Sequence, residues 1–235
     1  MSTSQNPSPR SLRALAHLLC YPDAALRQVL PEIDHALQQE AALSAPARAG
    51  LRALSQDLQE RAALDIEGEY VDLFDRGRAT SLHLFEHVHG DSRERGPAMI
   101  DLLKTYEQGG LYLDPARSDG ELPDHLPVVL EFASTLPTAA MRDFIGEFAH
   151  ILNALHQALQ RRDSLYAHVL AATLELGGQA LGGGAPAEEA PLDESWAEPE
   201  AFAGCSNPGQ SAPGQPQPLH FMPRHGASTA PGALS

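Results

Sequence analysis

Leucine and alanine recur at intervals of three and four residues through most of this 235-residue chain. Such spacing gathers apolar side chains on one face of an α-helix and predicts a series of amphipathic helices. The alternation of polar and apolar residues that marks a half-buried strand does not extend over a useful length, and aromatic residues make up only 6%. Because 43% of the residues are hydrophobic, the chain can bury a real core. The sequence therefore predicts an all-α fold.

Helix boundaries are predicted from the apolar period together with caps and breakers. Ser11, Asp23 and Asp124 are expected to cap helices, and Asp91 is expected to open a capping box with Glu94. The predicted helical segments are 11–20, 23–37, 46–64, 66–75, 81–89, 91–108, 124–136, 137–160 and 163–176.

The chain divides into three parts by composition. Residues 1–10 are expected to form a flexible N-terminus, and residues 11–176 a single-domain helical bundle of about eight to ten helices. Residues 177–235 hold ten of the 19 glycines and nine of the 19 prolines, which predicts a disordered tail. Within it, the acidic segment 191–202 carries the only tryptophan. Trp196 either packs the tail onto its own domain or contacts a partner.

Net charge and cysteine content restrict the partners and the compartment. The formal charge of −15 disfavours nucleic acid and anionic lipid and suits a basic partner. Two cysteines far apart in sequence exclude a disulfide framework and a C-x-x-C metal site. No apolar run approaches the ~20 residues of a membrane helix. We therefore expect a cytoplasmic protein that does not insert into membranes.

The stretch Tyr70–Arg95 is the richest in chemistry. It contains His83, Glu86 and His87 in the order H-x-x-E-H, a pattern of zinc peptidases. On a helix, the two histidines would share a face and the glutamate could serve as general base. A third ligand and a substrate cleft cannot be located in the sequence. The favoured interpretation is therefore a polar face on a short helix, and a zinc hydrolase is the remote alternative.

Arginines close this stretch. Arg93 and Arg95 stand near the start of a predicted helix, where an anion such as phosphate could bind. Acidic residues are numerous nearby, so internal ion pairs with Asp72, Asp75 or Glu86 are the favoured alternative.

A second polar pair stands at the start of a later helix. Asp124 and His125 could act as acid and base, but a helix cap beside a solvated imidazole is the simpler explanation. No glycine-rich phosphate loop occurs in the sequence, so no nucleotide site is predicted.

Several long blocks resemble one known family. YVDLFDRGRATSLHLFEHVHGDSRERGPAMIDLLKTYEQGGL, then ELPDHLPVVLEF, with LLCYPD before and LDESWAEP after, are similar to the NarJ-type nitrate reductase assembly chaperones. The resemblance covers most of residues 11–205 in order. A wider group of all-helical chaperones for molybdenum enzymes shares the pattern that here comprises Pro123, Asp124, His125, Glu131 and Phe132.

The resemblance implies a dedicated chaperone rather than an enzyme. Such a chaperone binds the N-terminal segment of the apo catalytic (alpha) subunit of respiratory nitrate reductase, with the alpha–beta complex as a further partner. It keeps the subunit competent for insertion of molybdenum cofactor and iron–sulfur clusters before membrane attachment. It has no cofactor of its own and is a monomer or a weak dimer. The alternative client is another molybdoenzyme, such as dimethyl sulfoxide or trimethylamine N-oxide reductase.

Motif matching also predicts where the client peptide binds. The histidines among the predicted residues would make binding sensitive to pH between about 5 and 8. The predicted peptide-binding residues are Tyr70, Phe74, Glu86, His87, His89, Arg93, Asp124, His125 and Glu131.

Overall fold

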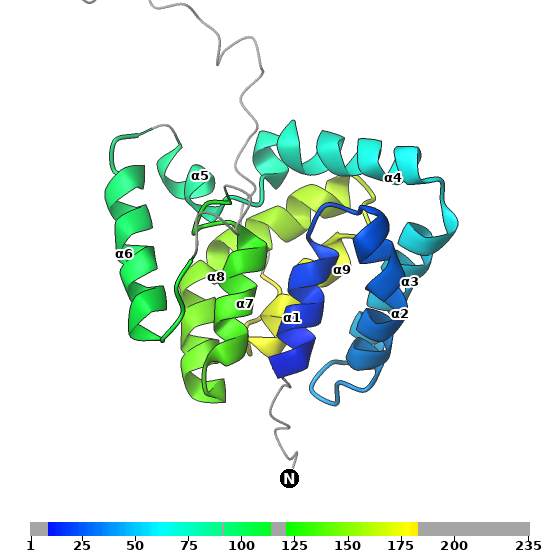
Figure 1. Ribbon diagram of the computed structural model, residues 1–235, viewed down its shortest axis with the longest axis horizontal. Coiled ribbons are helices and arrows are strands. Elements are labelled where there is room, and N and C mark those ends of the chain that lie inside the picture. The colour runs from blue at the N-terminus through cyan, green and yellow to red at the C-terminus, as the bar shows by residue number, and fades with distance from the viewer. Residues whose placement is uncertain (1–8, 91, 114–120, 183–235) are drawn as a thin grey trace, which may run out of the picture. The chain divides into compact units, whose positions relative to one another are not determined.

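A computed structural model describes residues 9–90, 92–113 and 121–182, all of which belong to one compact unit. Within these ranges the chain forms nine α-helices, a π-helical turn and a 3-10 turn, and no strand (Figure 1). The predicted all-α fold is confirmed. The elements are α1 (Pro9–Leu18), α2 (Ala24–Gln38), α3 (Ala45–Glu60), α4 (Ala63–Tyr70), η1 (Val71–Asp75), η2 (Arg78–Thr80), α5 (Leu84–His89), α6 (Arg95–Gln108), α7 (Leu126–Thr135), α8 (Thr138–Arg161) and α9 (Ala167–Leu176).

The core is built where α1, α7, α8 and α9 meet. α1 packs along α7, α8 packs along α9, and α1 also contacts α9. α9 is apolar on nearly all sides, and Val169, Leu170 and Leu174 are completely buried. A helix that is apolar all round belongs in the interior, and each fully buried leucine contributes about 1.5–3 kcal/mol. The core therefore fixes the relative positions of α1 and α7, which later form one wall of the candidate site.

The remaining helices surround this core. α2 pairs with α3, and α3 rests on α9. α6 stands at the edge of the bundle in Figure 1, and only Leu102 and Tyr106 of its 14 residues are buried. Most of the stability of a helix comes from packing of its apolar face. α6 is accordingly one of the less anchored elements in the described ranges.

Two of the predicted caps can be compared directly. Asp23 caps α2 as predicted, because its side chain accepts a hydrogen bond of 2.8 Å from the backbone N–H of Leu26. The prediction for Ser11 is wrong. α1 begins at Pro9, and Ser11 lies inside the helix, buried, where its hydroxyl donates to Glu40 Oε2 at 2.5 Å. A buried acceptor far along the chain, which the local sequence does not reveal, competes with the capping role.

Three boundaries around the polar stretch differ from the prediction. α5 begins at Leu84 rather than Ser81, and α6 begins at Arg95, with no side-chain cap from Glu94. Asp91 lies outside the described residues. The segment after α4 continues as the π-helical turn η1 instead of a plain α-helix. Such turns concentrate at functional sites.

The last described residues, 177–182, run beside α8. α9 ends at Leu176 with Gly177 as its C-cap, and Gly178 adopts a positive φ of 68° that a glycine accepts without strain. Asn153 then accepts a hydrogen bond from the backbone N–H of Gly182 at 2.8 Å. The predicted disordered tail comprises residues 177–235: residues 177–182 are described and Gly182 bonds to α8, whereas residues 183–235 lie outside the described ranges. None of the described helices is both long and apolar enough to cross a bilayer.

Candidate functional site

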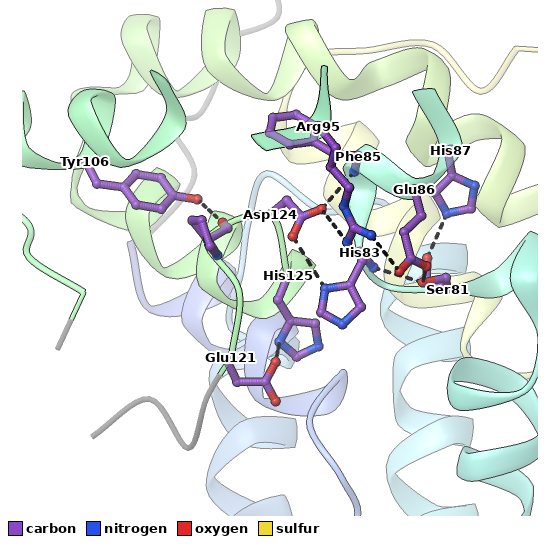
Figure 2. A network of polar contacts seen from close by, with 11 residues as sticks. Ser81, His83, Phe85, Glu86, His87, Arg95, Tyr106, Glu121, Asp124 and His125 are labelled. Carbon is purple, nitrogen blue, oxygen red and sulfur yellow. Dashed lines mark hydrogen bonds and ion pairs between the residues drawn. The ribbon is translucent and has the colours of Figure 1, made fainter. Parts of the chain in front are cut away.

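The polar stretch and the later Asp124–His125 pair meet through their backbones. Leu84 donates its backbone N–H to the carbonyl of Asp124 at 3.1 Å, and Leu126 donates to Leu82 at 2.9 Å. These bonds form an antiparallel bridge between His83 and His125, which lie side by side in Figure 2. The bridge joins the start of α5 to the start of α7.

Asp124 holds this junction together. Its side chain is fully buried, and its Oδ2 accepts a hydrogen bond of 3.0 Å from the backbone N–H of Phe85. Asp124 therefore caps α5, not α7 as predicted; α7 has no side-chain cap. The same carboxylate lies 3.4 Å from His83 Nδ1 and 3.7 Å from Arg95 Nη2. A buried charge of this kind requires such partners, since isolation in a core is costly.

The pKa values of the two bridging imidazoles shift in opposite directions. Their ring centroids are 5.1 Å apart. Contact with Asp124 raises the pKa of His83 above its usual value. Burial, followed by repulsion from His83, lowers the pKa of His125 to about 4. Glu121 Oε2 lies 2.8 Å from His125 Nδ1 and favours the charged form, but this half-exposed carboxylate is screened by water. His125 is therefore a neutral imidazole with only 12% of its side chain exposed, not the solvated one that was predicted.

A second cluster ties α5 to the start of α6. Ser81 donates to Glu86 Oε2 at 2.6 Å, and Arg95 Nη1 lies 3.3 Å from Glu86 Oε1. His87 Nε2 lies 2.8 Å from the carbonyl oxygen of Ser81 (Figure 2). The predicted ion pairing of the arginine with Glu86 is confirmed for Arg95. Arg93 is exposed in the turn before α6.

The H-x-x-E-H pattern does not form a zinc-binding face. His83 precedes the first turn of α5, whereas His87 lies within that helix, so the two rings do not share a helical face. Across residues 9–90, 92–113 and 121–182, no group of three or more histidine, cysteine or acidic side chains is placed to hold a metal ion.

Tyr70 and Phe74 belong to an aromatic cluster. Their ring centroids are 4.8 Å apart, and Tyr166 packs edge-on against Phe74 at 5.0 Å. Tyr70 donates its hydroxyl hydrogen to the carbonyl of Leu19 at 2.9 Å, and the ring of Tyr21 packs edge-on against it. Tyr70, the last residue of α4, thus joins that helix to the end of α1, and Phe74 of η1 packs against its ring.

A groove of about 830 Å³ opens beside this cluster. Its apolar lining comes from three helices: Ala16 of α1, Leu26 and Val29 of α2, and Pro127 and Val128 of α7. Tyr21, Tyr70, His83 and His125 complete it, with carboxylates at Asp23, Asp75, Glu121 and Glu131. We call this feature the acidic groove.

The thiol of Cys20 indicates the electrostatic character of the acidic groove. Burial raises its pKa to about 11, and the negative charges of Glu131, Glu121 and Asp23 add to the effect. Cys20 also donates to the carbonyl of Ala16. The thiol therefore stays protonated at neutral pH, and the acidic groove attracts cations rather than activating a nucleophile.

The predicted peptide-binding residues fall into three groups. Tyr70, His125 and Glu131 line the acidic groove. Phe74 and Asp124 are buried behind it. The other four do not line it; they lie on or beside α5 and in the turn before α6: Glu86, His87, His89 and Arg93.

Sequence reasoning missed the contribution of α1 and α2. In the sequence, nothing distinguishes these groove residues from other apolar positions of amphipathic helices: Ala16, Leu26 and Val29. Val29 nevertheless keeps 38% of its surface exposed inside the groove. Only the packing of α1 against α7, which is a tertiary contact, brings these side chains close to the His83–His125 bridge.

Comparison with known proteins identifies the family. A family model described as "Nitrate reductase delta subunit" matches residues 23–172. The chain belongs to this family. It is 44% identical over 167 residues to the "Nitrate reductase molybdenum cofactor assembly chaperone NarJ" of Escherichia coli K12, covering 71% of this chain and 69% of that protein. It is 34% identical over 172 residues to the "Probable nitrate reductase molybdenum cofactor assembly chaperone NarJ" of Bacillus subtilis, covering 69% and 86%.

Family membership confirms the resemblance seen in the sequence. The chain is an assembly chaperone of the NarJ type and not an enzyme. The zinc hydrolase alternative is thereby removed. The His83–His125 bridge joins the starts of α5 and α7, and both imidazoles line the acidic groove.

Proposed function

We propose that this chain binds the N-terminal segment of the apo catalytic subunit of respiratory nitrate reductase in the acidic groove. It holds the subunit competent for insertion of molybdenum cofactor and iron–sulfur clusters before membrane attachment. The observation that carries this proposal is an apolar groove of about 830 Å³ with an acidic rim, in a chain related to nitrate reductase assembly chaperones.

The lining of the acidic groove suits an amphipathic helix. Helix-in-groove recognition reads apolar side chains at positions i, i+3, i+4 and i+7 of the bound segment. Val29 and Val128 stand on different helices and supply apolar surface to the same groove. Tyr21, which is 44% exposed, adds a rigid aromatic side chain of the kind that dominates binding energy.

The charges of the rim select a basic segment. Asp23, Asp75 and Glu131 line the groove together with Glu121. Such a field raises the association rate of a cationic peptide and excludes acidic ones, while the apolar contacts supply most of the affinity. We therefore expect added salt to lower the association rate of the peptide and to leave its dissociation rate unchanged.

The predicted residues take different parts in this proposal. Tyr70, His125 and Glu131 contact the peptide. Asp124 positions His125 and α5 and touches no client, because its side chain is fully buried. The residues on and near α5 that lie outside the groove would meet only parts of the client beyond its N-terminal segment.

Calorimetry with a synthetic peptide of the reductase N-terminus tests the proposal. Val128→Asp places a carboxylate on the apolar lining and should weaken binding by about tenfold or more, the loss expected for a central apolar contact. The matched control is Ile100→Asp on α6, where the side chain is 55% exposed and outside the groove. Unchanged affinity in Val128→Asp would remove the groove from the account. Equal or tighter binding of a peptide from dimethyl sulfoxide reductase would transfer the proposal to that client.

A further inference from the structure

A second concave surface lies along α4 and shares no lining residue with the acidic groove. It consists of a narrow cavity of about 150 Å³ and a shallow hollow of about 650 Å³. Arg61 and Glu69 line both, so the two adjoin. We call the combined feature the α4 hollow.

A tyrosine whose buried hydroxyl has no partner in the described part of the chain lines the narrow end of the α4 hollow. Tyr166 is only 3% exposed, and its hydroxyl makes no hydrogen bond to any residue in the ranges 9–90, 92–113 and 121–182. Burial raises the pKa of this hydroxyl, so it remains protonated and can both donate and accept. A buried polar group without a partner costs about 1–3 kcal/mol, which a bound group would recover.

Charged side chains surround that hydroxyl. Arg61 Nη1 lies 2.6 Å from Glu69 Oε2 and 2.9 Å from Asp57 Oδ2, and Asp163 lines the same cavity. One guanidinium group and three carboxylates therefore line the narrow end. This excess of negative charge favours a cationic group as the occupant.

The open end combines apolar surface with further acids and with Arg162, whose Nη1 donates to the backbone carbonyl of Asp72 at 3.1 Å. Leu64 is 83% exposed, and a Cβ added to Gly68 would meet no atom of the described residues within 4 Å. Asp65 and Asp72 stand beside them, and Asp72 is paired with Arg76 at 2.8 Å. An exposed leucine next to a position without a side chain offers a place for apolar side chains of another chain.

We propose that the α4 hollow docks a basic amphipathic segment of a partner protein. Apolar side chains of that segment pack on Leu64 and over Gly68. One of its lysines inserts into the narrow end, where the ammonium group donates to Tyr166 Oη and lies among the carboxylates. An ammonium group has three donors and no acceptor, so it can donate to the Tyr166 hydroxyl and to the carboxylates of the narrow end without displacing Arg61. The proposal is independent of the acidic groove and its client.

Nuclear magnetic resonance on the full chain tests this docking. The probe is a short helical peptide made only of leucine and lysine, and its lysine-acetylated form is the uncharged comparator. Both are titrated into the full chain, and the Val128 amide signal is followed beside those of Leu64 and Gly68, so that binding in the acidic groove is distinguished from docking in the α4 hollow. We expect saturable shifts of the Leu64 and Gly68 amide signals with the cationic peptide only.

Three variants of the full chain separate the possible outcomes. Asp65→Lys should weaken binding by about fivefold, whereas Glu32→Lys, the same charge change at an exposed position of α2, should change it by less than about twofold. Tyr166→Phe, which keeps the ring packing, should weaken binding by about threefold.

Three results would overturn the proposal. The first is an absence of shifts at Gly68. The second is equal weakening by Asp65→Lys and Glu32→Lys, which would mean general charge attraction only. The third is full affinity in Tyr166→Phe, which would mean that the narrow end holds only water.

Discussion

Replacing Asp124 by alanine should destabilise the protein more than any exposed charge substitution. The side chain is completely buried and accepts the backbone N–H of Phe85. It also faces His83 at 3.4 Å and Arg95 at 3.7 Å. The substitution leaves the Phe85 N–H without an acceptor and the arginine without one of its two carboxylates.

The magnitude follows from these contacts. Loss of an acceptor for a buried N–H costs about 1–3 kcal/mol, and removal of one partner from a buried ion pair costs about 3–5 kcal/mol. Arg95 keeps its contact with Glu86 and is 21% exposed, which reduces the second contribution. We expect a loss of about 3–4 kcal/mol in the free energy of unfolding. Asp124→Asn retains an acceptor and should lose about half as much.

Urea unfolding followed by circular dichroism measures this difference. The control is Asp101→Ala on α6, which removes an exposed carboxylate that lies 2.9 Å from Lys104 Nζ. Such a surface pair is worth at most about 1 kcal/mol. Losses of similar size in the two variants would refute the claim that Asp124 holds the start of α5.

Three further predictions concern pH, charge and packing. The unfolding free energy should be greatest near pH 6.5. Below pH 6.5, the unfolded chain protonates His125 before the folded chain does, because folding lowers the pKa of this residue; about 2–4 kcal/mol of the unfolding free energy is lost by pH 4. His125→Gln should abolish that loss. Above pH 6.5, the stabilisation that protonated His83 provides disappears as His83 deprotonates, because folding raises its pKa. Glu131→Lys should lower the association rate of the peptide by about threefold to tenfold at low salt in stopped-flow measurements, with little change in its dissociation rate. A change confined to the dissociation rate would count against electrostatic steering. Gly109→Ala should lower the unfolding free energy by about 1–3 kcal/mol, because a Cβ there would lie 2.5 Å from the ring of Phe132, and unaltered stability would show that the ring moves aside freely.

The sequence predicted those features that depend on neighbours along the chain. Apolar periodicity identified the helices, and Asp23 capped α2 because its partner, Leu26, lies three residues ahead. The prediction for Asp124 failed for the converse reason. Its acceptor atom serves Phe85, 39 residues earlier, through a backbone bridge that no local pattern encodes.

The candidate site was predicted only in part for the same reason. Tyr70, His125 and Glu131 were identified by motif and do line the acidic groove. Val29 was not identified, since an apolar residue on an amphipathic helix looks the same whether it packs in a core or lines a groove. Whether the groove binds a reductase peptide stays a prediction.

Cofactor content of the reductase in living cells tests the central claim most directly. A strain that lacks this gene would be complemented with the wild-type gene, with Val128→Asp or with Ile100→Asp, at matched protein levels, and molybdenum would be measured in the purified catalytic subunit. We predict cofactor-free subunit with Val128→Asp and normal loading with the other two. Normal loading with Val128→Asp would contradict the assignment of chaperone function to the acidic groove.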